Sequence, residues 1–252
     1  MTATFGSALE GKVAIVTGAN TGLGQAFARD MAAAGALVAC VGRSSMDETL
    51  AAIDAPDRTL AIEADLSSLE PIDRIVSEVL AWAGRIDILV NNAGIIRRAD
   101  ALDFTETDWD DVMQVNLKSL FFLSQAVARV MVPEGRGKIV NIASLLSFQG
   151  GIRIPSYTAS KSGVAGLTRL LACEWASKGI NVNAVAPGYV RTNNTKALQE
   201  DPERNRAIVE RIPAGRWAEA SDISGAVLFL ASSAADYVHG ITLPVDGGWL
   251  AR

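Results

Sequence analysis

Short runs of apolar residues alternate along the chain with longer segments in which apolar residues recur every three or four positions. The short runs are rich in β-branched residues and predict strands buried on both faces of a sheet, whereas the longer segments predict helices that cover it. The predicted strands are residues 13–17, 37–41, 59–63, 86–91, 138–142, 181–185 and 241–245. The predicted helices are residues 22–34, 46–53, 71–83, 108–132, 157–178 and 221–232.

This alternation of strands and helices predicts the fold class. At 252 residues the chain has room for one large domain or two small ones, but no Pro- or Ser-rich linker and no charge run interrupts the pattern. The sequence therefore predicts a single-domain α/β fold over residues 1–252. We expect a doubly wound (Rossmann-type) seven-stranded parallel sheet with helices on both faces. Ligands of such sheets bind beyond the carboxyl ends of the strands.

Composition narrows the compartment and the class of partner. Hydrophobic residues make up 49% of the chain, and the net charge is −5 without any block of basic residues, so nucleic acid and membrane are not expected as partners. No apolar stretch is expected to span a bilayer, and residues 1–11 lack a secretory pattern, so we expect a cytoplasmic protein. Cys40 and Cys173 are expected in the core. No ligand spacing indicates a metal site.

A glycine-rich tract follows the first predicted strand. After Thr17 the glycines have the spacing G-x3-G-x-G, and a predicted helix begins at once. Glycine allows the close approach of a pyrophosphate, and a helix N-terminus supplies free N–H groups and a partial positive charge. An ordinary tight turn is the alternative, and the strand–glycine–helix context favours a dinucleotide. The candidate residues for binding it are Gly18, Asn20, Thr21, Gly22, Leu23 and Gly24.

A second tract carries candidate acid/base chemistry. Ser144 precedes Tyr157, and Lys161 follows Tyr157 by four positions, a spacing that places both side chains on one face of a helix. A phenol has a pKa of about 10, too high for an efficient base near neutrality, and a cation held nearby lowers it. Together with a dinucleotide site, this set predicts an NAD(P)-dependent oxidoreductase that interconverts an alcohol and a ketone.

Further tracts agree with these two. Residues 91–94 (Asn-Asn-Ala-Gly) and Pro187-Gly188 each follow a predicted strand, and Asn116 lies in the predicted helix 108–132. In this order, and over almost the whole chain, the motifs resemble those of the short-chain dehydrogenase/reductase family.

The resemblance implies roles for individual residues. Tyr157 exchanges a proton with the substrate oxygen, and Ser144 holds that oxygen by a hydrogen bond. Lys161 lowers the pKa of the phenol and binds the nicotinamide ribose, while Asn116 distorts its helix and anchors a water that joins Lys161 to solvent. The implied cofactor contacts beyond the glycine tract are Asp65, Leu66, Asn92, Ala93, Gly94, Tyr157, Lys161, Pro187, Gly188, Val190 and Thr192.

The end of the second predicted strand bears on the choice between NAD and NADP. A carboxylate there selects NAD, whereas an arginine accommodates the 2′-phosphate of NADP. This chain has Gly42 at that place, followed by Arg43 and Ser44, which favours NADP. The most similar members of the family are known as NAD users, so both cofactors remain open.

Within the family, segments 144–157, 186–195, 211–217 and 246–252 resemble the dehydrogenases of sugar acids, of the 2-deoxy-D-gluconate or 2-dehydro-3-deoxy-D-gluconate type. An anionic sugar acid needs a cation or several hydrogen-bond donors near the reacting carbon. The candidate substrate residues are Arg97, Ser144, Gln149, Arg153 and Tyr157. The polar, helix-prone residues 193–211 are expected to form a lid.

Two other functions share the motifs. A 3-oxoacyl-carrier-protein reductase would dock an acidic carrier protein on a basic surface, and the net charge of −5 argues against it. A non-catalytic dinucleotide sensor would typically lack Tyr157 or Lys161, and both are present.

The predicted helices 108–132 and 157–178 carry apolar residues on more than one face, among them Phe121, Phe122 and Leu171. A helix of this kind needs a second burial partner. The family resemblance implies that these helices form subunit contacts, and we expect a homotetramer.

Overall fold

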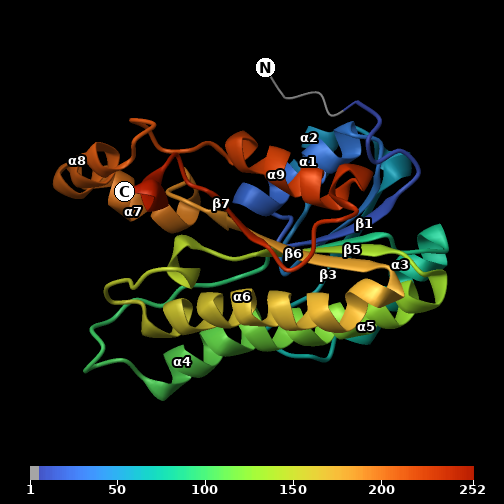
Figure 1. Ribbon diagram of the computed structural model, residues 1–252, viewed down its shortest axis with the longest axis horizontal. Helices are drawn as coiled ribbons and strands as arrows, with labels where there is room; N and C mark the ends of the chain where they lie inside the picture. The colour runs from blue at the N-terminus through green and yellow to red at the C-terminus, as the bar shows by residue number, and fades with distance from the viewer. Residues whose placement is uncertain (1–5) are drawn as a thin grey trace.

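Seven parallel strands form one sheet in the computed structural model, which describes residues 6–252 (Figure 1). Their order is β3-β2-β1-β4-β5-β6-β7, so the order reverses between β1 and β4, where doubly wound sheets bind ligands. The strands are β1 (Val13–Thr17), β2 (Leu37–Gly42), β3 (Thr59–Glu63), β4 (Ile88–Asn91), β5 (Gly137–Ile142), β6 (Ile180–Pro187) and β7 (Thr242–Val245). The predicted fold class is confirmed. Residues 1–5 of the predicted domain lie outside the described residues.

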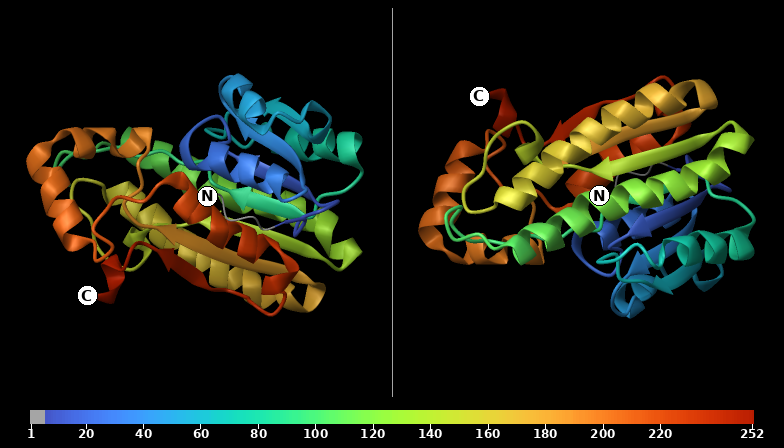
Figure 2. Two further views of the ribbon diagram at one scale, coloured as in Figure 1. Left: turned by 90° about the horizontal axis from the view of Figure 1, so that it is seen from above. Right: turned by 90° about the horizontal axis from the view of Figure 1, so that it is seen from below.

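Helices cover both faces of the sheet. The upper layer in Figure 1 contains α1 (Gly22–Ala33), α2 (Asp47–Ile53) and α9 (Ala220–Ala231). The lower layer contains α3 (Ile72–Ala83), α5 (Leu120–Glu134) and α6 (Pro155–Trp175). Figure 2 shows each layer in front of the sheet, from above and from below.

The alternating side chains of the strands build two cores, one on each face. In β1, Ala14 and Val16 pack with the buried residues of α1 and α9, whereas Val13 and Ile15 pack with those of α3 and α5. Successive residues of a strand point to opposite faces, so a strand that is apolar throughout must be covered on both. Burial of each such Val or Ile side chain contributes about 1.5–3 kcal/mol.

The predicted helix 108–132 is a longer stretch with three parts. It comprises α4 (Glu106–Met113), a π-helical segment (Gln114–Ser119) and α5. It begins earlier than expected because the Thr105 hydroxyl accepts a hydrogen bond from the backbone N–H of Asp108 (3.1 Å) and caps the helix. The π-helical segment lies where the resemblance implies a distortion at Asn116.

The remaining helices are short. The segment expected to form the lid contains α7 (Lys196–Glu200) and α8 (Pro202–Arg211). The 3₁₀ turns are Pro56–Arg58, Leu145–Ser147, Ala176–Lys178, Asn193–Thr195, Ser233–Ala235 and Trp249–Ala251.

Two expectations from composition are wrong. From the sequence, no apolar stretch was expected to be long enough to span a bilayer. By length and composition, the helical stretch Glu106–Glu134 is long and apolar enough to do so. In the fold this stretch packs through α5 against the lower face of the sheet. Cys40 is buried in β2, and burial raises the pKa of its thiol to about 12. Cys173, expected in the core, is exposed on α6.

The turn before β6 is a place where only glycine fits. Gly179 has φ +79°, and an added Cβ would collide with the carbonyl oxygen of Gly135. Gly84, at the end of α3, has φ +72° but open space around it. We expect Gly84→Ala to cost about 1–2 kcal/mol, the strain of the left-handed conformation alone. Gly179→Ala should cost about 1–3 kcal/mol more, because the clash adds to the strain. Urea unfolding of both variants measures the difference, and equal losses would contradict this account of the turn.

Candidate active site

A cleft of about 540 Å³ runs along the carboxyl ends of the strands. The predicted site residues that line it are Gly18, Asn20, Thr21, Gly22, Leu23, Arg43, Asp65, Leu66, Asn92, Ala93, Gly94, Arg97, Ser144, Tyr157, Lys161, Pro187, Gly188, Val190 and Thr192. Four predicted residues, Gly24, Asn116, Gln149 and Arg153, do not line it. The glycine tract and the acid/base set, 120 residues or more apart in the chain, therefore face one cavity.

The glycine tract has the shape of an anion cradle. Gly18 has φ +64°, and an added Cβ would lie 2.9 Å from the amide nitrogen of Asn92. Gly24 is a packing glycine, because a Cβ there would collide with the carbonyl oxygen of Gly18. Helix α1 begins at Gly22 without a side-chain cap and without an acidic residue in its first turn, so its N–H groups face the cleft. These features fit the pyrophosphate of a dinucleotide.

Thr17 joins the ends of β1 and β4 beneath this cradle. Its hydroxyl donates to the carbonyl oxygen of Val90 (3.3 Å) and accepts from the backbone N–H groups of Asn92 and Ala93 (3.0 Å each). The Asn92 side chain donates in return to the carbonyl oxygen of Thr17 (2.9 Å). The glycine tract and the loop after β4 consequently form one rigid floor for the cleft.

Gly42 supplies no carboxylate at the end of β2, and a side chain there would have to displace its neighbours. An added Cβ on Gly42 would lie 2.8 Å from the side-chain oxygen of Asn20 and would collide with the methyl group of Met46. Arg43 is exposed and lines the cleft. Ser44 accepts a hydrogen bond from Asn20 (2.8 Å), which ties this loop to the glycine tract.

Helix α6 carries Tyr157 and Lys161 into the cleft. The Lys161 ammonium is buried, donates to the carbonyl oxygen of Ile142 (2.6 Å) and lies 5.6 Å from the centre of the Tyr157 ring. Burial lowers the pKa of Lys161 to about 8. Burial also raises the pKa of Tyr157, against the opposing effects of a hydrogen bond with Ser144 and the charge of Arg98. Within the chain, desolvation thus outweighs the neighbouring charges, whereas the sequence predicted a lowered phenol pKa.

A buried polar chain holds α6 against the sheet. Asn141 of β5 donates to the hydroxyl of Thr168 on α6 (3.0 Å), and it accepts from the side chain of Asn91 on β4 (2.9 Å). The Asn91 amide also donates to Ser124 on α5 (2.9 Å). Thr168 follows Lys161 by two helical turns, so both lie on the face of α6 that meets β5.

Asn116 ties the loop after β4 to α6. Its side-chain oxygen accepts from the backbone N–H of Ile95 (2.8 Å), and its amide donates to the carbonyl oxygen of Ile95 (3.0 Å) and to Ser160 (3.2 Å). Asn116 is buried in the π-helical segment and does not itself line the cleft. Its predicted contact with a water stays a prediction.

The predicted substrate residues are held in different ways. Arg97 lines the cleft but forms ion pairs with Asp108 (3.3 Å) and Asp111 (3.0 Å). Arg153, at φ +64° and with 59% of its side chain exposed, pairs with Asp100 (3.3 Å) outside the cleft.

Gln149 also lies outside the cleft lining, between Ser144 and Tyr157 in the chain. Its side-chain oxygen accepts a hydrogen bond from the indole N–H of Trp249 (3.1 Å).

Comparison with known proteins places this arrangement in a family. A family model described as enoyl-(acyl carrier protein) reductase matches residues 18–250. The 2-dehydro-3-deoxy-D-gluconate 5-dehydrogenase of Escherichia coli (strain K12) is 57% identical over 97% of each chain. A crystal structure from Agrobacterium tumefaciens, described as a candidate 2-deoxy-D-gluconate 3-dehydrogenase with bound NADP, is 60% identical; the match has a TM-score of 0.89 and covers 99% of this chain and 100% of that one.

A second crystal structure, from Beutenbergia cavernae, has NADP bound at low occupancy. It is described as a candidate NAD(P)-dependent gluconate 5-dehydrogenase and is 50% identical with a TM-score of 0.93; the match covers 99% of this chain and 100% of that one. The chain belongs to the short-chain dehydrogenase/reductase family. The predicted class of enzyme, an NAD(P)-dependent oxidoreductase, is confirmed.

Several residues of this dehydrogenase line the cleft without having been predicted. Two groups of these residues had a pattern in the sequence that could have identified them. Ile95 and Ile96 follow Gly94 directly, and Asp111, Gln114 and Val115 have the three- and four-residue spacing of one helix face just before Asn116. The full set is Val41, Gly42, Ala64, Ser67, Ile95, Ile96, Asp111, Gln114, Val115, Ile142, Ala143, Asn193 and Thr195.

The lowered pKa of Lys161 makes stability depend on pH. Because the pKa is about 8 in the fold and 10.5 in its ordinary state, the unfolded chain binds more protons between these values, and the free energy of unfolding rises with pH there. Lys161→Met lacks this effect. From about pH 7 to about pH 9.5 the native chain should gain on the order of 2 kcal/mol relative to the variant. Urea unfolding of both proteins at several pH values measures this; a difference that stays constant with pH would contradict it.

Proposed function

We propose that this dehydrogenase interconverts a secondary alcohol and a ketone on a sugar acid of the 2-deoxy-D-gluconate or 2-dehydro-3-deoxy-D-gluconate type. The observation that carries the proposal is the 57% identity, over 97% of both chains, with the E. coli 2-dehydro-3-deoxy-D-gluconate 5-dehydrogenase. The cleft supports it, since Ser144, Tyr157 and Lys161 face the same cavity as the glycine tract.

Tyr157 is the proposed acid/base. In the oxidising direction its phenolate takes the proton of the substrate hydroxyl, and in the reducing direction the phenol donates it to the forming alkoxide. Ser144 holds the same oxygen by a hydrogen bond and stabilises the charge that develops there. The phenol must lose its proton to act as a base, and its pKa is raised by burial, so oxidation is favoured at alkaline pH.

Lys161 and Asn116 assist Tyr157, the first through its charge and the second by positioning its neighbours. The Lys161 ammonium favours the phenolate and would bind the nicotinamide ribose. Its lowered pKa means that this charge is lost above about pH 8, which sets an upper limit to the favourable range. Asn116 keeps Ile95 and Ser160 in place and anchors the water that joins Lys161 to solvent.

The cofactor would lie along the glycine tract and the carboxyl ends of β2 to β6. When bound, NADP or NAD would supply the acceptor for the hydride that leaves the carbinol carbon. Gly18, Gly22 and the N–H groups of α1 would hold the pyrophosphate. We propose NADP as the preferred cofactor, because Gly42 supplies no selecting carboxylate and Arg43, the next residue, lines the cleft. The two relatives with bound NADP support this preference.

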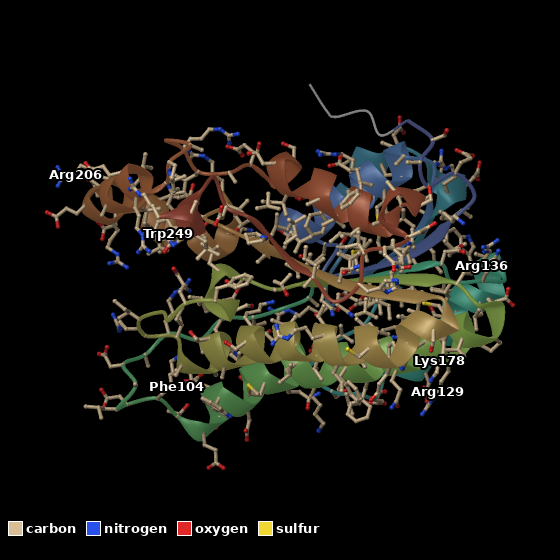
Figure 3. The ribbon with its side chains drawn as sticks, viewed as in Figure 1. Phe104, Arg129, Arg136, Lys178, Arg206 and Trp249 are labelled. Carbon is tan, nitrogen blue, oxygen red and sulfur yellow. The ribbon has the colours of Figure 1, made fainter. Side chains whose placement is uncertain are left out.

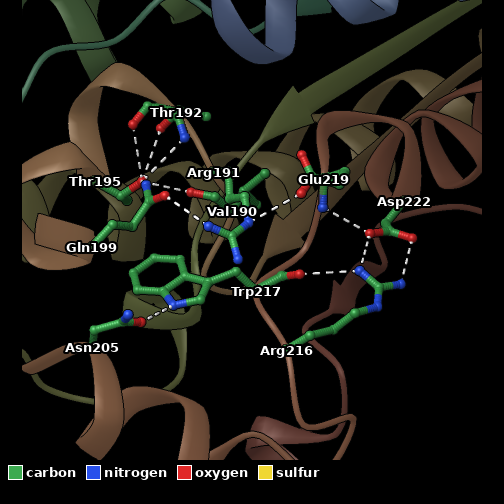
Figure 4. A network of polar contacts seen from close by, with 10 residues as sticks. All are labelled: Val190, Arg191, Thr192, Thr195, Gln199, Asn205, Arg216, Trp217, Glu219 and Asp222. Carbon is green, nitrogen blue, oxygen red and sulfur yellow. Dashed lines mark hydrogen bonds and ion pairs between the residues drawn. The ribbon is translucent and has the colours of Figure 1, made fainter. Parts of the chain in front are cut away.

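Residues 193–211 are the proposed lid, and Figure 4 shows the contacts at its base. The chain segments on either side of the lid are paired: Val190 bridges to Ala218, and the backbone N–H of Arg191 donates to the carbonyl oxygen of Ala218 (2.9 Å). The Arg191 guanidinium pairs with Glu219 (3.1 Å) and donates to Gln199 of α7 (3.3 Å). A base held this way lets α7 and α8 move as a unit. Arg97, Gln149 and Arg153 are the proposed hydrogen-bond donors for the sugar acid.

We also propose a cytoplasmic homotetramer. A groove of about 620 Å³ crosses the outer side of the helices. Its apolar lining includes Leu117, Phe121, Phe122 and Leu167, and its charged lining is Asp110, Asp111 and Lys118. Exposed apolar surface of this kind is typical of a contact between subunits.

Replacement of Tyr157 by Phe tests the acid/base role. Tyr157→Phe removes only the phenolic O–H, so we expect kcat for sugar-acid oxidation to fall by about 10²–10⁴-fold while the dissociation constant of NADP changes little. Steady-state kinetics and a fluorescence titration with NADPH measure the two quantities. Retention of full activity would refute the mechanism.

Initial rates test the substrate class and the cofactor preference together. With 2-deoxy-D-gluconate at mildly alkaline pH, turnover should be faster with NADP than with NAD at equal low concentration. In Arg43→Ala the KM for NADP should rise about 10-fold or more, the loss expected for one charge-assisted contact, while the KM for NAD stays nearly constant. No turnover with either cofactor, together with NADPH-dependent reduction of a β-ketoacyl thioester, would favour the 3-oxoacyl-carrier-protein reductase instead.

A further inference from the structure

Residues 246–252 fold back from β7 onto the end of the proposed lid. Gly247 and Gly248 both have left-handed backbones, at φ +66° and +91°. An added Cβ on Gly247 would lie 2.9 Å from Ile212, and one on Gly248 would lie 3.0 Å from Pro213. The backbone N–H of Ala214 donates to the carbonyl oxygen of Gly247 (2.9 Å). The two glycines therefore allow the chain to lie directly on the segment that follows α8.

Trp249 stands at the centre of this contact (Figure 3). It is only 4% exposed, and its ring lies 4.7 Å from the ring of Tyr189 and 3.9 Å from the guanidinium of Arg211, the last residue of α8. Its indole N–H donates to the side-chain oxygen of Gln149 (3.1 Å). One side chain thus contacts the loop after β6, the lid and the segment between Ser144 and Tyr157.

A second tie strengthens the contact with the lid. The Arg252 guanidinium donates to the carbonyl oxygen of Glu210 (2.7 Å), in the last turn of α8, where carbonyl groups have no partner within the helix. The end of α8 is therefore held by both Trp249 and Arg252.

The hydrogen bond from Trp249 also orients the amide of Gln149. Because the oxygen of that amide accepts from the indole, its NH₂ group is the end left to donate to another oxygen. We propose that Trp249 is a positioning residue for the substrate: it couples the lid to Gln149, which lies outside the cleft lining, and keeps the Gln149 NH₂ group as the end that would donate to an oxygen of the sugar acid. The inference rests on the proposed function, since it needs an oxygen-rich substrate.

Trp217 offers a matched control for the packing of this region. It belongs to the same apolar cluster as Trp249, and its ring contacts Tyr189 (5.4 Å between centres). Its indole N–H donates to Asn205 of α8 (2.7 Å), within the lid, as Figure 4 shows. Substitution of either tryptophan by Phe keeps an aromatic ring and removes one indole hydrogen bond, but only Trp249→Phe releases Gln149.

Steady-state kinetics with 2-deoxy-D-gluconate and the preferred cofactor test the inference. Trp249→Phe should raise the KM for the sugar acid about five- to tenfold, the effect of one hydrogen bond, with kcat and the cofactor KM within about twofold of the native values. Trp217→Phe should leave all three parameters within about twofold. The effects of Trp249→Phe and Gln149→Leu should not multiply in the double variant, because both break the same link.

Three outcomes would overturn the inference: an unchanged KM in Trp249→Phe, an equal rise in Trp217→Phe, or multiplying effects in the double variant. If Trp249→Phe does not fold, Gln149→Glu replaces it, since a carboxylate still accepts from Trp249 but repels an anionic substrate; a KM rise no larger than that of Gln149→Leu would then refute the inference. If the native protein turns over the sugar acid and the variants give any of these outcomes, the inference is refuted while the proposed function stands. Native protein without turnover rejects the proposed function and the inference with it.

Discussion

The packing of α6 against β5 is the contact on which the proposed chemistry depends. Two consecutive residues of β5 hold the helix two turns apart: the carbonyl oxygen of Ile142 accepts from the Lys161 ammonium, and the side chain of Asn141 donates to Thr168. Both contacts are buried. A shift of α6 along the strand would leave a buried ammonium or amide without a partner, at a cost of about 1–3 kcal/mol or more for each group. Tyr157, one turn before Lys161, takes its place in the cleft from this fit.

Much of the fold and the cofactor side of the cleft could be predicted from the sequence. The bounds of β1 and β3 are those predicted. In β1 the apolar run is buried on both faces, and such runs are unambiguous in a sequence. The glycine tract could also be predicted, since a strand, closely spaced glycines and a helix can be identified without knowledge of distant contacts. The strand ends of a parallel sheet meet at one edge, which explains why residues from six strand ends share the cleft.

The substrate side could not be predicted to the same depth. Arg97 and Arg153 are cationic as expected, but each has an acidic partner, Asp111 or Asp100, that only the folded loops bring near. Cys173 lies on the exposed side of α6, because helical periodicity does not show which of two apolar faces meets the sheet. The contact between Trp249 and Gln149 joins residues 100 positions apart, and no local pattern in the sequence predicts it. Tertiary contacts between segments far apart in the chain fix these loops, and such contacts determine the geometry of the substrate side of the cleft.

The division between a rigid cofactor side and a substrate side built from loops has a chemical consequence. Strand ends joined by Thr17 and Asn92 hold the glycine tract in one position, which suits a cofactor common to the whole family. The loops after β4, β5 and β6 can differ in sequence without disturbing the sheet, so they are where a sugar acid would be told apart from other alcohols.

In the proposed reaction the cleft oxidises the secondary alcohol of a sugar acid. The most direct test is nuclear magnetic resonance of the product formed from 2-dehydro-3-deoxy-D-gluconate and NADP, with NADPH followed by absorbance in the same sample. We expect one new ketone carbon at C5 and one NADPH for each molecule converted. NADPH formation without a new ketone, or no conversion while a β-ketoacyl thioester is reduced, would contradict it.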